Sequence, residues 1–132
     1  MLPPAYAELH CLSSFSFLRG ASQPVELAER AEALGYAALA LTDECSVAGV
    51  VRAHAALKGR RTRLIVGTEL HLDCGLPLVV LAADRRGYGQ MCRLITRARR
   101  AAPKGSYVLQ RADVEALWAL CREVAEESAP LG

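Results

Sequence analysis

The fold is decided by the stretch Tyr6-Ala7-Glu8-Leu9-His10-Cys11-Leu12-Ser13-Ser14-Phe15-Ser16-Phe17-Leu18-Arg19-Gly20-Ala21-Ser22. Residues 5–11 predict a β-strand, which passes directly into a turn rich in serine and other small residues. His10 lies at the end of that strand, where a histidine is a candidate metal ligand. The side chains that would complete a metal site are missing from the turn, so the stretch resembles the outline of a hydrolase pocket with part of its chemistry removed.

Outward from this stretch, expected strands and helices alternate. The expected helices are residues 22–35 with Ser22 as N-cap, 47–57, 88–100 and 112–124; Glu26 comes one residue late for a strict capping box. The further expected strands are residues 37–41, 64–66 and 76–82, with a short strand or bridge at 107–109. Apolar strands alternating with helices predict an α/β fold in which helices cover parallel strands.

The composition is that of a folded domain or part of one. The chain has 132 residues, of which 52% are hydrophobic, and this excludes general disorder. Its longest apolar run, residues 76–83, is too short to span a membrane, and no signal peptide is visible. The five cysteines form no CxxC pair, so we expect reduced thiols and a cytoplasmic protein without membrane attachment.

Polar residues recur where the predicted strands end. These candidates for a metal site are His10, Asp43, Glu44 and Glu69. Imidazole and carboxylate groups suit Zn²⁺, Mn²⁺ or Fe²⁺, ions that activate water for phosphoester hydrolysis. Three of these residues also have a structural interpretation: His10 as a hydrogen-bonded strand end, Asp43 as a turn or helix cap, and Glu69 as a surface residue.

A basic segment lies in the second half of the chain. Residues 85–104 contain seven Arg or Lys and no acid, whereas residues 113–127 are predominantly acidic. The basic side chains could contact nucleic-acid phosphates, form a solvated helix face, or pair with the acidic segment, and the sequence leaves these alternatives open. The candidate nucleic-acid contacts are Arg93, Arg97, Arg100 and Lys104.

Four motifs, in order, resemble a known family. They are ELHCLSSFSFLRGA (8–21), ALTDECSVAG (40–49), LIVGTEL (64–70) and LVVLAADRRGYGQMCRLI (78–95). This pattern is similar to the polymerase and histidinol phosphatase (PHP) domain at the N-terminus of the bacterial DNA polymerase III alpha-subunit family. Within that family, the residues of the motifs are most similar to those of the error-prone branch. The resemblance covers roughly residues 5–115.

The resemblance implies a PHP-type barrel related to the TIM barrel, of which this chain supplies about the first half. Residues 1–132 would then form a single partial domain, with a frayed tail at 128–132. Departures from the family pattern are Leu12, Arg19 and Pro77, none of which can bind a metal. His10, Glu44 and Glu69 remain as possible ligands with Asp43 nearby, and the Arg19 guanidinium opposes a cation electrostatically.

The expected function is therefore that of a structural segment of an error-prone, damage-tolerant DNA polymerase with a degenerate metal site. The alternative is a metal-dependent phosphoesterase or 3′–5′ exonuclease. We expect no cofactor in this chain, or Zn²⁺ or Mn²⁺ if the residual site is active. The expected partners are the remainder of a polymerase or a second copy of the chain, because an open half-barrel exposes apolar strand edges, with DNA reached through the parent protein.

Overall fold

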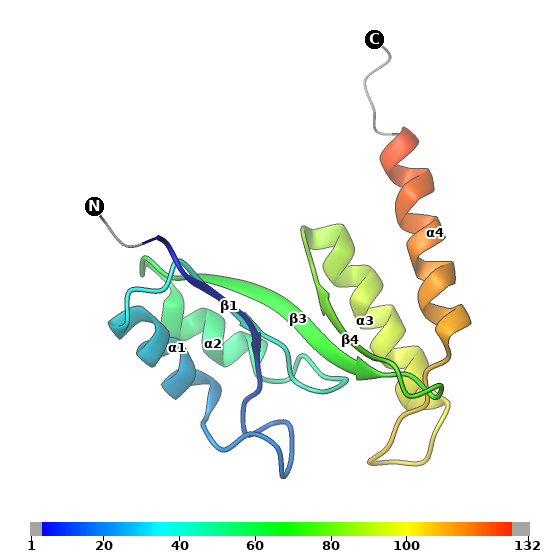
Figure 1. Ribbon diagram of the computed structural model, residues 1–132, viewed down its shortest axis with the longest axis horizontal. Helices are drawn as coiled ribbons and strands as arrows, with labels where there is room; N and C mark the ends of the chain where they lie inside the picture. The colour runs from blue at the N-terminus through cyan, green and yellow to red at the C-terminus, as the bar shows by residue number, and fades with distance from the viewer. Residues whose placement is uncertain (1–3, 128–132) are drawn as a thin grey trace.

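The computed structural model describes residues 4–127 and contains one four-stranded sheet in the order β1-β2-β3-β4 (Figure 1). The strands are β1 (Ala7–Cys11), β2 (Ala38–Leu41), β3 (Arg63–His71) and β4 (Pro77–Leu81). β1, β2 and β3 are parallel neighbours, and the sheet curls into a half-barrel accompanied by helices. The predicted α/β class and partial barrel are confirmed.

β4 departs from the all-parallel expectation, because it runs antiparallel to β3. A tight turn joins the two strands: Gly75 has a φ of 88°, and the Leu72 N–H donates to the Leu76 carbonyl at 2.9 Å. A parallel neighbour needs a long crossover connection, whereas a short turn returns the chain in the opposite direction. β3 is also much longer than the predicted strand at 64–66 and continues through Glu69 to His71.

The helices form two groups along the sheet. α1 (Pro24–Ala33) and α2 (Val50–Leu57) pack together beside β1–β3, whereas α3 (Arg85–Arg100) and α4 (Arg111–Glu127) accompany β4 (Figure 1). Among residues 4–127, no helix is long and apolar enough to cross a membrane.

Several boundaries differ from the sequence expectation for local reasons. The N-cap of α1 is Gln23 rather than Ser22, so Glu26 falls at the third helical position and accepts the Gln23 N–H at 2.7 Å, as a capping box requires. α3 begins at Arg85, earlier than expected, because the Asp84 side chain caps it by accepting the Gly87 N–H at 2.7 Å. Residues 107–109 form neither strand nor bridge. The predicted frayed tail at 128–132 lies outside the described residues.

Two apolar clusters hold these layers together. The first joins α1 and α2 to β2 and contains Ala28, Ala31, Leu39 and Leu57. The second joins β3 to α3 and α4 and contains Cys45, Leu70, Leu72, Leu94, Ala98, Leu109 and Val114. Among the polar candidate residues, His10 lies near the end of β1, Asp43 and Glu44 follow the end of β2, and Glu69 lies on β3.

Candidate carboxylate site

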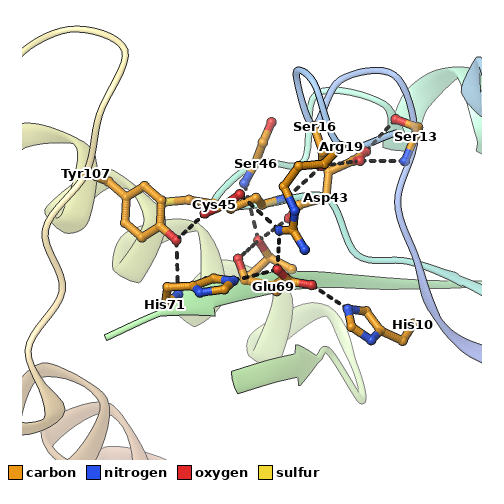
Figure 2. A network of polar contacts seen from close by, with 12 residues as sticks. His10, Ser13, Ser16, Arg19, Asp43, Cys45, Ser46, Glu69, His71 and Tyr107 are labelled. Atoms are coloured by element: carbon orange, nitrogen blue, oxygen red, sulfur yellow. Dashed lines mark hydrogen bonds and ion pairs between the residues drawn. The ribbon is translucent and has the colours of Figure 1, made fainter. Parts of the chain in front are cut away.

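Glu69 is the centre of a polar network near the C-terminal ends of β1 and β2 (Figure 2). Its side chain is only 4% exposed and contacts three nitrogen-bearing side chains. His10 Nε2 lies 2.5 Å from Oε2, His71 Nε2 lies 2.7 Å from Oε1, and the Arg19 guanidinium also contacts Oε1. A buried carboxylate is tolerated here because charged and polar donors surround it.

Glu44 comes beside Glu69 because strand pairing continues past the end of β2. The two residues form an isolated parallel bridge, in which the Cys45 N–H donates to the Glu69 carbonyl at 2.8 Å. The Glu44 carboxylate accepts the Tyr107 hydroxyl on Oε1 at 2.8 Å and Arg19 on Oε2 at 3.0 Å. Two acidic side chains from neighbouring segments therefore share one site.

Arg19 connects the two carboxylates. Its NH1 nitrogen donates to both Glu44 and Glu69, and these hydrogen bonds raise the pKa of the guanidinium. The loop before it turns sharply: Leu18 has a φ of 62°, and the Arg19 and Gly20 N–H groups both donate to the Ser16 carbonyl at 3.0 Å. The loop thus directs a permanent positive charge to the position where the carboxylates meet.

Glu69 is ionised at neutral pH. Burial opposes its ionisation, but hydrogen bonds from Arg19, His71 and His10 outweigh burial and lower the pKa of the carboxyl group to about 2. An ionised carboxylate only accepts hydrogen bonds, so each imidazole Nε2 that contacts it carries the proton. The network is therefore a set of donors arranged around the side chains of Glu69 and Glu44.

Asp43 lies in the same region but is turned toward the Ser-rich loop. Its buried carboxylate accepts the Ser13 N–H and the Ser16 hydroxyl on Oδ1 and the Ser13 hydroxyl on Oδ2, each at 2.7 Å. Ser16 Oγ in turn accepts the Glu44 N–H at 3.0 Å. These contacts correspond to the turn-stabilising interpretation of Asp43 and hold the loop that carries Arg19.

His71 and Tyr107 belong to the site but were not among the residues expected there from the sequence. His71 is two positions after Glu69 on β3, and this alternation places both side chains on one face of the strand. Tyr107 reaches the site from the segment between α3 and α4, where its hydroxyl also accepts the His71 N–H at 3.0 Å. Burial and the neighbouring Glu44 carboxylate raise the pKa of Tyr107 to about 12, although the His71 N–H opposes this shift. The alternation was a usable signal for His71, whereas nothing local identified Tyr107.

The residues present do not fit a metal ion in this arrangement. All four carboxylate oxygens of Glu44 and Glu69 already accept a hydrogen bond, and the two imidazoles present protons rather than lone pairs to Glu69. Metal ligation needs deprotonated histidine nitrogens and free carboxylate oxygens. Within the part of the chain that the structure describes, no group of three or more His, Cys, Asp or Glu side chains has a geometry suited to a metal.

The predicted nucleic-acid contacts form a separate surface on and after α3. Arg93, Arg97, Arg100 and Lys104 are exposed, and the three arginines line one shallow depression. Arg97 pairs with Asp113 at 2.7 Å, so the acidic segment neutralises part of this surface. On another side of the same helix, Arg99 donates to the Cys45 carbonyl through Nε at 3.2 Å and through NH2 at 3.1 Å, and stacks over Tyr107. α3 therefore links the basic surface to the carboxylate site.

Comparison with known proteins identifies related sequences and folds. Residues 8–129 match the family model of the PHP domain. Error-prone DNA polymerase of Dechloromonas aromatica is 64% identical over 114 residues, or 86% of this chain, and the enzyme of the same name from Pseudomonas aeruginosa is 60% identical over 111 residues, or 84% of this chain. The chain spans only 11% of the length of each of these relatives.

Two solved structures resemble the fold. A protein described as a metal-dependent phosphoesterase from Bifidobacterium adolescentis is 26% identical with a TM-score of 0.55, covering 75% of this chain and 35% of that protein. An amidohydrolase from Chromobacterium violaceum is 29% identical with a TM-score of 0.59, covering 74% of this chain and 34% of that protein. Because the family model spans most of the sequence and the four motifs form one curled sheet with its helices, the chain belongs to the PHP domain family.

Proposed function

We propose that this chain is the PHP segment of an error-prone DNA polymerase and that it serves the polymerase as a structural module. The observation that carries this proposal is the position of Arg19, which bonds to both Glu44 and Glu69 where a hydrolase of this type would need open coordination sites. The sequence identity to error-prone DNA polymerases over most of the chain supports the proposal that the parent protein is such a polymerase. Residues 1–132 are proposed to form one partial domain, working in the cytoplasm.

The alternative function is a metal-dependent phosphoesterase or 3′–5′ exonuclease. The likeness to a protein described as a metal-dependent phosphoesterase favours it. For such chemistry, His10, Glu44 and Glu69 would have to bind Zn²⁺ or Mn²⁺ together with ligands from outside this chain. Arg19 would first have to leave both carboxylates, and this requirement makes the structural function the better supported of the two.

The deciding experiment uses the complete polymerase, assayed for primer extension and for 3′–5′ hydrolysis of single-stranded DNA with added Mn²⁺ or Zn²⁺. The informative variant is His10→Ala, and the matched control is His54→Ala on the exposed surface of α2. The structural function predicts no metal-dependent hydrolysis by the wild type and primer extension by both variants. Hydrolysis that is lost in His10→Ala but kept in His54→Ala would establish the exonuclease instead.

We also propose that the basic surface of α3 contacts DNA phosphates in the parent protein. The supporting observation is that Arg93, Arg97 and Arg100 project from one face of the helix into a shared depression. Each phosphate contact releases counterions, so affinity should fall steeply with salt. Replacing Arg93 and Arg100 with Ala should reduce the slope of log K against log salt by about 2, whereas Arg30→Ala on α1 should leave it unchanged. Equal slopes for all variants would exclude these contacts.

The proposed partner is the remainder of the polymerase or, for the isolated chain, a second copy. β1 and β4 are the edge strands of the sheet. Beside β4 an apolar groove is lined by Leu78, Leu81, Met91, Leu117 and Trp118. Trp118 is 62% exposed, and such surfaces favour association. Light scattering of the isolated chain tests this: a dimer or larger species is expected, and a stable monodisperse monomer would contradict it.

A further inference from the structure

The contacts of Arg19 differ from those of an ordinary surface ion pair. Its side chain is 40% exposed, yet the same NH1 nitrogen bonds to the nearly buried Glu69 and to the half-buried Glu44. One cationic nitrogen therefore bridges two carboxylates that belong to neighbouring strand segments. A divalent ion that bridges two carboxylates likewise offsets the repulsion between them, although it carries two positive charges rather than one.

Without Arg19, the site would hold two adjacent carboxylates with no permanent countercharge in direct contact. His10 and His71 donate to Glu69, and Tyr107 donates to Glu44, but these side chains carry no fixed positive charge. The Arg99 guanidinium donates to the backbone carbonyls of Glu44 and Cys45 rather than to either carboxylate. Like charges held close together in a partly buried site destabilise the folded state.

The loop that carries Arg19 is built to hold it in place. Asp43 accepts three hydrogen bonds from Ser13 and Ser16, and Ser16 accepts the Arg19 N–H through its carbonyl. Gly20 packs so closely against the backbone of Ser13 that a Cβ at position 20 would lie 2.0 Å from the Ser13 carbonyl oxygen. The guanidinium is thus presented on a constrained turn, which lowers the entropic cost of holding it between two acceptors.

We propose that Arg19 is an internal counterion that takes the place of a divalent cation, so that the carboxylate site keeps its shape without any metal. This inference rests on the proposed structural function and deepens it by naming the residue that replaces the ion. It follows that loss of the guanidinium frees Glu44 Oε2 and one acceptor position on Glu69 Oε1, and these become a latent cation site. The side chain is accessible from solvent, so an added ion can reach the carboxylates once the guanidinium is absent.

The test measures the melting temperature of the 132-residue chain in EDTA and in increasing Mn²⁺. The wild type should melt at the same temperature in both. Arg19→Ala should melt about 4–8 °C lower in EDTA, and saturating Mn²⁺ should return about 4 °C of that loss. Arg19→Lys keeps the charge and should remain insensitive to Mn²⁺.

Two controls separate this effect from general ion binding. Arg97→Ala breaks the surface pair with Asp113 and should show no Mn²⁺ response. Adding Glu69→Gln to Arg19→Ala should abolish the response of the single variant. The inference is overturned if Mn²⁺ stabilises the wild type as much as Arg19→Ala, or if Arg19→Ala responds no more than Arg97→Ala. Hydrolysis of DNA by the wild-type polymerase is measured separately and would overturn the structural function, so the two failures are distinguishable.

Discussion

Replacing Asp43 tests whether the Ser-rich loop is held by one buried carboxylate. The side chain is 2% exposed and accepts three hydrogen bonds of 2.7 Å, from the Ser13 N–H, the Ser13 hydroxyl and the Ser16 hydroxyl. Asp43→Ala removes all three acceptor contacts and leaves the donors buried. Hydrogen bonds to a charged group contribute about 1.5–3 kcal/mol each, and their effects within one network are not additive. We therefore expect Asp43→Ala to lower the free energy of unfolding by about 3–5 kcal/mol.

Asp43→Asn should cost much less, for a geometric reason. The amide oxygen can keep the Oδ1 position, which accepts both the Ser13 N–H and the Ser16 hydroxyl. The amide nitrogen then faces Ser13 Oγ, which can rotate its proton away and accept instead. Only the charge is lost, and we expect a decrease of about 1–2 kcal/mol in the free energy of unfolding.

The assay is urea unfolding of the 132-residue chain followed by far-ultraviolet circular dichroism, analysed with equal m-values. Asp84→Ala is the matched control, because it removes one exposed capping bond to the Gly87 N–H and should cost about 1 kcal/mol. The reasoning is refuted if Asp43→Ala destabilises no more than this control. It is equally refuted if Asn and Ala at position 43 have the same effect.

Three further predictions use the same unfolding assay. Lowering the pH from about 4.5 to about 2 should lower the free energy of unfolding by at most about 3 kcal/mol, because the pKa of Glu69 is about 2 in the folded chain against its usual 4.5. Glu69→Gln should flatten this pH dependence, and a variant with the same pH profile as the wild type would contradict the prediction. Gly20→Ala should lower the free energy of unfolding by more than about 2 kcal/mol, because the added Cβ would lie 2.0 Å from the Ser13 carbonyl oxygen. Gly89→Ala in α3 has open space around the added Cβ and should raise the free energy of unfolding by about 0.5–1 kcal/mol. Similar effects of the two substitutions would refute the clash at position 20. Tyr107→Phe should cost about 1–2 kcal/mol through loss of the contacts to Glu44 and His71. Tyr6→Phe loses an exposed bond to Glu8 and should cost less than about 0.5 kcal/mol; equal losses would exclude a stabilising role for the partly buried Tyr107 hydroxyl.

The helices and the first three strands follow from local patterns. Period-two and apolar runs mark β1 and β2, and the helical stripes end at Gly35 and Gly59, which adopt φ values of 72° and 74°. The length of β3 and the direction of β4 were not predictable in this way. Strand length depends on the partner that pairs with it, and strand direction depends on the turn at Gly75.

The sequence by itself determined the α/β class, the family motifs, and the candidate residues His10, Asp43, Glu44 and Glu69. It also indicated that a guanidinium at position 19 opposes a nearby cation electrostatically. Only the tertiary structure decided that Arg19 bonds to both carboxylates, that His71 and Tyr107 complete the network, and that Asp43 holds the loop. The His71–Glu69 contact joins neighbours two positions apart on β3, but the other contacts join residues 25–63 positions apart. Side-chain partners at such separations are set by strand register and loop path rather than by local sequence.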